Sequence, residues 1–152
     1  MITIITGDKN VGKTSYLEAW YDREKRGVGF CSRKVWHGET CEGYDLVFFP
    51  AGGSRPLMRV KEKPASGSSS RFQVDPAAVL RAEQWMRSHP WSRTAPVWID
   101  EIGRLELEGK GFDSLFRRVL AERREIRVVF RKQVLKDLIA QYGLRGYRLI
   151  VL

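Results

Sequence analysis

The residues most able to do chemistry are Gly-Asp-Lys-Asn-Val-Gly-Lys-Thr at positions 7–14, a complete G-x-x-x-x-G-K-T pattern. The pattern follows a β-favouring apolar run at 2–6 and precedes a helical pattern at 15–26, which is the setting of a phosphate-binding loop. Backbone N–H groups of such a loop, together with the positive end of the following helix, favour an anion. Lys13 would add a point charge at the β and γ phosphates of a nucleoside triphosphate, and the Thr14 hydroxyl suits Mg²⁺. We therefore assign nucleotide binding to Gly7, Asp8, Lys9, Asn10, Val11, Gly12, Lys13, Thr14 and Ser15.

A pair of acids follows the short apolar run Val97-Trp98-Ile99. An acid at the end of a buried strand can hold Mg²⁺ opposite the phosphate loop, so Asp100 is the predicted second metal residue beside Thr14. Glu101, one residue further on, is placed to orient or deprotonate water, which favours hydrolysis over transfer to a bound acceptor. An acidic helix cap would use the same residue types and is the structural alternative.

An arginine is expected to complete charge neutralisation at the γ phosphate. Arg131 directly follows the predicted strand 126–130 and is the first candidate, with Arg104 as the second. The predicted catalytic residues are therefore Glu101, Lys13 and Arg131. A solvated arginine without a role in the reaction is the alternative for either arginine.

Strand-like and helix-like patterns alternate along the chain, which predicts an α/β fold with a mostly parallel sheet. Strands are expected at 2–6, 97–99, 126–130 and 147–152, and helices at 15–26, from Pro76 to the His89-Pro90 stop, at 112–120 and at 135–142. Two further β-like runs, 27–35 and 44–49, predict an antiparallel hairpin added to this sheet. The site should lie at the carboxyl ends of the parallel strands.

Length and composition predict one globular domain covering 1–152, because 43% of the residues are apolar. A Pro-, Ser- and Gly-rich segment at 61–71 is expected to form a mobile loop or a linker. No run approaches the ~20 apolar residues of a membrane span. We therefore expect a cytoplasmic protein with no membrane partner. Cys31 and Cys41 are isolated cysteines and predict neither a disulfide framework nor a metal site.

The chain is basic, with 27 Lys and Arg against 18 Asp and Glu and a formal charge of +9. This balance favours polyanionic partners. In the second half of the chain, however, acids are interleaved with the basic residues, so solvated helix faces explain the charge equally well. Trp36 and Trp91, expected to be exposed, leave a nucleic-acid-associated ATPase open as an alternative, although no nucleic-acid-binding motif supports it.

The wider string at 97–107, Val-Trp-Ile-Asp-Glu-Ile-Gly-Arg-Leu-Glu-Leu, resembles the D-E-I-G-x-x-E-L motif of the THEP-type, or cancer-related, nucleoside-triphosphatases. Residues 29–32 and 43–47 are similar to the glycine-aromatic hairpin of that family, and 57–59 to its L-A-R segment. The resemblance implies a small P-loop enzyme of three-layer, RecA-like α/β fold that hydrolyses several ribonucleoside triphosphates slowly with Mg²⁺.

By position, the same resemblance implies phosphate and metal binding by the loop, metal binding by Asp100 and direction of the attacking water by Glu101. Glu106 matches the motif without an assigned role. The chain departs from the family at Arg33 and Lys34, where acidic residues are often found, and at 70–72, where Ser-Arg-Phe replaces a glycine-lysine-aromatic segment.

Two other nucleotide-binding classes share parts of these patterns. A small GTPase would explain the loop and the D-x-x-G at 100–103, but the chain has no N/T-K-x-D string to read guanine. A small-molecule kinase would also use a phosphate loop, Mg²⁺ and a lid. Glu101 argues against a kinase, although an acid there could deprotonate an acceptor hydroxyl.

Overall fold

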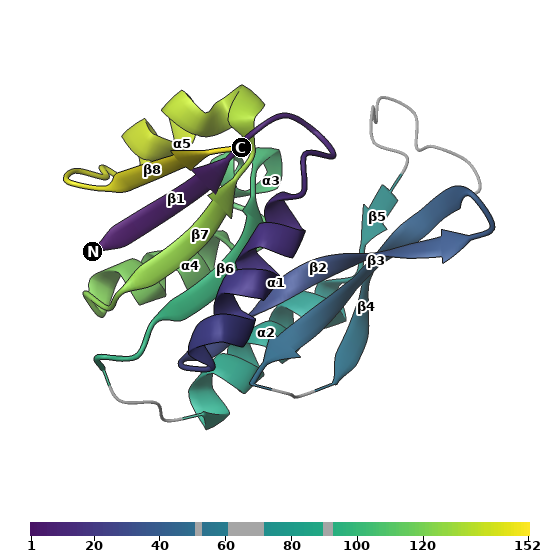
Figure 1. The fold of residues 1–152 in the computed structure, drawn as a ribbon, viewed down its shortest axis with the longest axis horizontal. Coiled ribbons are helices and arrows are strands. Elements are labelled where there is room, and N and C mark those ends of the chain that lie inside the picture. The colour runs from purple at the N-terminus through teal and green to yellow at the C-terminus, as the bar shows by residue number, and fades with distance from the viewer. Residues whose placement is uncertain (51–52, 61–71, 90–92) are drawn as a thin grey trace.

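The computed structural model describes residues 1–50, 53–60, 72–89 and 93–152 (Figure 1). The expected mobile loop at 61–71 and the tryptophan at position 91 lie outside these residues. The expected mobility of the loop and the expected exposure of this tryptophan therefore stay predictions.

The described residues form a sheet of eight strands in the order β5-β4-β3-β2-β6-β7-β1-β8. The strands are β1 Ile2–Thr6, β2 Val28–His37, β3 Thr40–Phe49, β4 Ser54–Val60, β5 Phe72–Val74, β6 Val97–Ile102, β7 Ile126–Phe130 and β8 Arg148–Val151. The neighbours β2, β6, β7, β1 and β8 pair in parallel. Strands β3, β4 and β5 continue the sheet in antiparallel pairing beyond β2.

Helices cover both faces of the sheet (Figure 1). They are α1 Lys13–Glu24, α2 Pro76–Ser88, α3 Arg104–Leu107, α4 Asp113–Ala121 and α5 Leu135–Gln141, with the 3₁₀ turn η1 Lys132–Val134 before α5. Neighbouring residues of β1 show the two faces: Ile4 packs into the core with α2, α4 and α5, and Ile5 into a second core with α1. The predicted three-layer α/β architecture is confirmed. Among the described residues, no helix is long and apolar enough to cross a bilayer.

Local sequence signals account for the elements that flank the site. The Asp75 side chain accepts a hydrogen bond from the backbone N–H of Ala77 at 2.9 Å, and Pro76 occupies the first position of α2. In α4, the buried residues Leu115, Phe116 and Val119 recur at helical spacing. All five residues of β7 are buried, because this parallel strand is covered on both faces.

The structure differs from the sequence-based expectations in several boundaries. The expected hairpin is part of a larger antiparallel extension, because β4 pairs with β3 and also with β5. The strand expected at 97–99 continues to Ile102, so the two acids lie within β6 and not after it. Helix α1 begins at Lys13, two residues early, and the one-turn elements α3 and η1 were not expected, because they are too short to show a period.

Candidate active site

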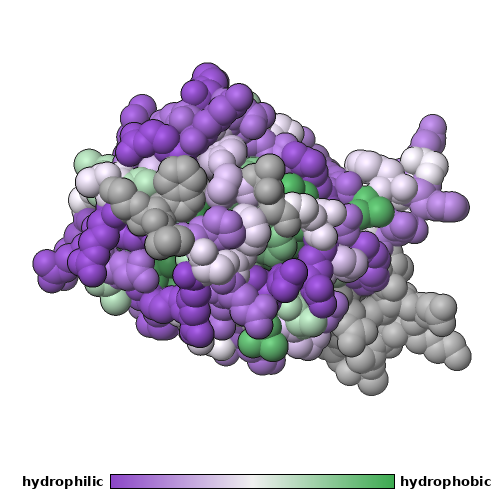
Figure 2. Space-filling view, turned by 90° about the horizontal axis from the view of Figure 1, so that it is seen from below, coloured by the Kyte–Doolittle hydropathy of each residue, from purple (hydrophilic) through white to green (hydrophobic). Residues whose placement is uncertain are grey.

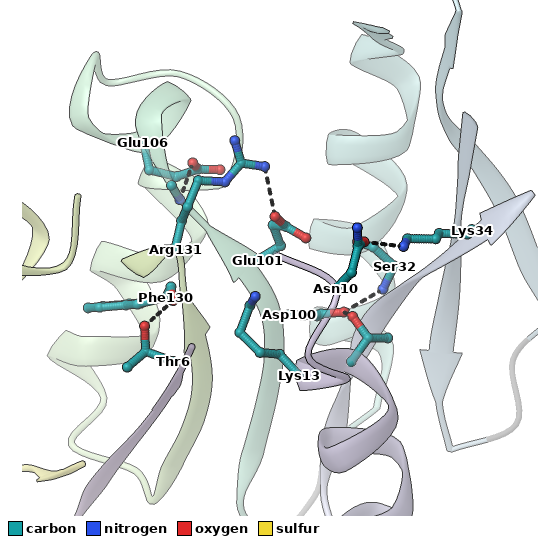
Figure 3. Close-up of polar contacts among 12 residues, drawn as sticks. Thr6, Asn10, Lys13, Ser32, Lys34, Asp100, Glu101, Glu106, Phe130 and Arg131 are labelled. Carbon is teal, nitrogen blue, oxygen red and sulfur yellow. Dashed lines mark hydrogen bonds and ion pairs between the residues drawn. The ribbon is translucent and has the colours of Figure 1, made fainter. Parts of the chain in front are cut away.

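The phosphate loop joins β1 to α1 at the carboxyl end of the sheet. The Thr6 hydroxyl donates to the carbonyl of Phe130 at 2.9 Å, which ties the end of β1 to the end of β7. The Lys13 ammonium donates to the carbonyls of Gly7 at 3.2 Å and Asp8 at 2.8 Å, so its charge lies over the loop (Figure 3). Asn10 takes a left-handed φ of 65°, a conformation that asparagine tolerates better than most residues.

Asp100 meets the phosphate loop in a buried contact. The Thr14 hydroxyl donates to its Oδ2 at 2.7 Å, and the backbone N–H of Ser32 donates to the same oxygen at 3.0 Å. The carboxyl is fully buried, and this desolvation, with the nearby charge of Glu101, raises the pKa of Asp100 to about 7. The structure thus brings together the two residues predicted to hold the metal.

Two buried oxygen atoms beside this contact lack partners. Asp100 Oδ1 and Ser32 Oγ are enclosed and find no hydrogen-bond partner in the part of the chain that the structure describes. An unsatisfied buried polar group costs about 1–3 kcal/mol, and native proteins usually supply water or an ion. Carboxylate and hydroxyl oxygens are the ligands of a hard cation such as Mg²⁺. The residues present therefore fit a divalent cation.

Glu101 lies at an irregular point of the sheet. The pairing register between β6 and β7 shifts between Ile99 and Ile102, and Glu101 takes a φ of 63°. Bulges of this kind turn a side chain away from the regular strand direction. The turned carboxylate accepts from Arg131 Nη2 at 2.8 Å (Figure 3), so two predicted catalytic residues are in contact. Arg104 is exposed at the start of α3 and makes no ion pair among the described residues.

Glu106, which the sequence left without a role, connects the segment after the acid pair. Its buried carboxylate accepts the backbone N–H of Gly103 at 2.9 Å and that of Phe112 at 3.2 Å. Burial raises the pKa of Glu106. Gly111 has a φ of +59°, and a Cβ there would lie 2.5 Å from Glu106 Oε1. Glu106 therefore fixes the path of the chain from β6 to α4.

Two further lysines flank the phosphate loop and were missed at the sequence level. Lys132 Nζ pairs with Asp8 Oδ1 at 2.8 Å, and Lys34 Nζ donates to Asn10 Oδ1 at 2.5 Å. The Lys132 ammonium holds the pKa of Asp8 below its usual range. Lys34 stood out in the sequence only as a departure from the family's often acidic residue, and for Lys132 the basic composition was the only signal. Ser32, also missed, comes from β2, which pairs with β6.

The G-x-x-x-x-G-K-T loop after β1, an acid within β6 bonded to Thr14, and β7 between these two strands are the arrangement typical of a P-loop nucleotide-binding fold. A family model described as NTPase matches residues 2–151, and the chain belongs to this nucleoside-triphosphatase family. The resemblance inferred from the sequence motifs is confirmed.

Relatives and solved structures agree with this assignment. The nucleoside-triphosphatase THEP1 of Aquifex aeolicus (strain VF5) is 28% identical over 126 residues, which cover 79% of this chain and 71% of that protein. The crystal structure of THEP1 from the hyperthermophile Aquifex aeolicus matches with a TM-score of 0.72 at 23% identity, covering 100% of this chain and 90% of that one. The solution structure of a human cancer-related nucleoside triphosphatase matches with a TM-score of 0.72 at 23% identity, covering 99% and 87%. At this identity, the structural matches show a shared fold.

Proposed function

We propose that this nucleoside-triphosphatase hydrolyses ATP, GTP and other nucleoside 5′-triphosphates to the diphosphate and phosphate in a Mg²⁺-dependent reaction directed by Glu101. The observation that carries the proposal is the buried contact between Thr14 and Asp100, next to the unpartnered Asp100 Oδ1. Thr14 and Asp100 are the side chains that would hold the metal. Bound there, Mg²⁺ would neutralise charge on the phosphates.

Lys13 and the loop backbone bind the phosphates in this proposal. The acceptors of the Lys13 ammonium are two loop carbonyls, and phosphate oxygens can replace them without leaving a buried charge unpaired. The ammonium would then lie against the β and γ phosphates. Lys13 thus has a partner both before and after substrate binding.

Glu101 and Arg131 act together in this proposal. The ion pair at 2.8 Å keeps the Glu101 carboxylate oriented, with one of its oxygens occupied by the Arg131 guanidinium. When the Arg131 guanidinium turns to the γ phosphate, the carboxylate is free to accept a proton from water. The water oxygen forms the new bond to the γ phosphorus, and the bridging oxygen leaves with the nucleoside diphosphate. Arg131 would stabilise the charge that develops on the phosphoryl oxygens.

Use of several bases is supported by the sequence itself. The chain contains no N/T-K-x-D string, with which small GTPases select guanine. The phosphate loop, Asp100 and Glu101 all act on the triphosphate, which every nucleoside triphosphate shares. We therefore expect binding to depend on the triphosphate far more than on the base.

The test is phosphate release from ATP, GTP, CTP and UTP, with and without Mg²⁺, by the wild type, Glu101→Gln and Glu108→Gln. Glu108 is an exposed carboxylate shortly after the same motif and serves as the matched control. We expect Mg²⁺-dependent release from several triphosphates, a fall of about 10²- to 10⁴-fold in Glu101→Gln, and no change in Glu108→Gln. Retained affinity of Glu101→Gln for a non-hydrolysable triphosphate would locate the defect in the reaction. Wild-type turnover by Glu101→Gln would refute the role of this carboxylate.

A further inference from the structure

A second concentration of charge lies between the carboxyl-terminal ends of α2 and α4. Three arginines, Arg87, Arg118 and Arg124, and His89 line a cavity of about 410 Å³ together with Glu122. We call this cavity the basic pocket. In Figure 1 the end of α2 lies at the bottom and the phosphate loop at the top, so the pocket is separate from the candidate active site. Seen from below, the surface of the molecule is largely hydrophilic (Figure 2).

The charges of the basic pocket are poorly balanced. Arg87 and Arg118 form no ion pair within the described residues, and Arg124 Nη1 lies 3.8 Å from Glu122 Oε2. A basic residue near the end of a helix is favourable by itself, because it complements the helix dipole. That effect does not explain why arginines from two helices and the following turn line one cavity. Their mutual repulsion would be relieved by an anion.

Arg124 supplies an independent observation. Its side chain is only 10% exposed, and one of its donors, Nη2, reaches the carbonyl of Ala95 at 3.1 Å. Its Nε is buried and has no hydrogen-bond partner in the described structure. The protein therefore compensates this buried guanidinium only in part, which is costly, and an oxyanion in the cavity that Arg124 lines would balance its charge.

We propose that the basic pocket binds a small phosphate-bearing molecule at a site separate from the phosphate loop. The volume exceeds what a single phosphate needs and lies within the range of about 300–1,000 Å³ that is typical of small-molecule sites. Met86 and Val119 add apolar surface for the carbon part of such a ligand. Ala95, which Arg124 holds, lies two residues before β6, so the ligand would brace the start of the strand that carries Asp100.

Calorimetric titration with inorganic pyrophosphate in the absence of Mg²⁺ tests the proposal. Pyrophosphate also suits the phosphate loop, so the titration is performed on Lys13→Ala, which lacks the lysine of that loop. Binding is expected to persist in Lys13→Ala and to weaken at least tenfold when Arg118→Gln is added. The matched control adds Arg123→Gln instead. Arg123 is exposed on the turn that also carries Arg124 but does not line the pocket, so this change should leave binding unchanged.

Competition by ribose 5-phosphate examines the organic part of the ligand. We expect it to displace pyrophosphate from Lys13→Ala, because the apolar wall can contact the sugar. Loss of all pyrophosphate binding in Lys13→Ala would overturn the proposal. Equal weakening by Arg118→Gln and Arg123→Gln would also overturn it, since that result indicates general charge attraction. Failure of ribose 5-phosphate to compete would refute a site for a phosphate ester.

Discussion

The candidate active site has two layers with different physical character. The outer layer, which we call the rim, consists of two ion pairs of 2.8 Å, Arg131 with Glu101 and Lys132 with Asp8. All four side chains are partly or largely exposed. The inner layer, the floor, consists of Ser32, Asp100 and Glu106, whose exposed fractions are 5%, 0% and 4%.

The difference in burial separates residues that can exchange partners from residues that fix geometry. Exposed ion pairs contribute about 0–1 kcal/mol, so replacing the carboxylate partner of Arg131 by a phosphate oxygen costs little. Breaking a buried hydrogen bond leaves a polar group without a partner and costs about 1–3 kcal/mol. Changes at the rim should therefore alter turnover without altering stability, whereas changes in the floor should alter stability or metal affinity.

After Glu101→Gln, the largest effect is expected from its partner in the rim, in Arg131→Ala. Removing a charge that stabilises the developing phosphoryl oxygens should lower kcat by about 10²- to 10³-fold. The free energy of unfolding should change by less than about 0.5 kcal/mol, because the lost ion pair is exposed. Steady-state kinetics and urea unfolding on the same preparation would measure both quantities.

Lys132→Ala is the matched control for this rim prediction. Lys132 carries the same charge, has the same exposed fraction of 51% and pairs with Asp8 beside the loop. We expect a change of only a few fold, mainly in KM, because a surface charge near the phosphates attracts the substrate without contacting the transferred group. Unchanged kcat in Arg131→Ala, or an equal fall in both variants, would exclude a specific role for Arg131.

The next largest effect is expected in the floor, from Ser32→Ala. If the unpartnered hydroxyl holds a water of the metal site, its loss should weaken Mg²⁺ affinity about tenfold, the lower end of outer-shell effects. Mg²⁺ titration of the binding of a non-hydrolysable triphosphate would measure this without turnover. The control is Ser88→Ala, an exposed serine at the end of α2. An unchanged Mg²⁺ dependence in Ser32→Ala would contradict the prediction.

The parts predicted best from the sequence have local, periodic signals. The strand β1 and the loop after it, the helix α4 and the strand β7 follow from spacing within a few residues, and the structure has each of them where the sequence predicts it. Trp36 is exposed, as expected.

The missed features depend on contacts between distant parts of the chain. Ser32 joins the floor only because β2 lies beside β6, and Lys132 reaches Asp8 across 124 positions of sequence. Ser32 lies in the hairpin string at 29–32 that resembles the family, but that string assigns it no role, and Lys132 lies in no motif. The positive φ of Glu101 also escaped prediction, because it depends on a register shift between two strands and glutamate has no preference for that conformation. Single-sequence patterns do not carry such information.

In Glu106→Gln, the change is expected in folding stability, with no direct effect on the reaction. The two carboxylate oxygens each accept one backbone N–H, from Gly103 and from Phe112, whereas an amide has only one oxygen. One buried N–H should lose its partner, and the free energy of unfolding should fall by about 1–3 kcal/mol. Urea unfolding of Glu106→Gln and of the exposed control Glu108→Gln would test this. Equal stability of the two variants would show that Glu106 does not anchor the segment.

The smallest expected effect is the difference in unfolding free energy between Gly111→Ala and Gly109→Ala. This comparison separates the contact with Glu106 from backbone strain. Both glycines have positive φ values, +59° and +75°, so an alanine at either position costs about 1–2 kcal/mol of strain. A Cβ at 109 meets nothing within 4 Å, whereas a Cβ at 111 would lie 2.5 Å from Glu106 Oε1. Gly111→Ala should therefore be less stable by about a further 1 kcal/mol, since the carboxylate must shift away from its backbone donors.

A double-mutant cycle locates the source of that difference. In a Glu106→Ala background the carboxylate is absent, so the excess cost at position 111 over position 109 should disappear while the strain at both positions remains. Denaturant unfolding of six proteins would give the coupling free energy: the wild type, the three single variants and the two double variants that contain Glu106→Ala. An excess that persists without the carboxylate would mean that Gly111 is required for the turn alone. The floor would then consist of Asp100 and Ser32, without Glu106.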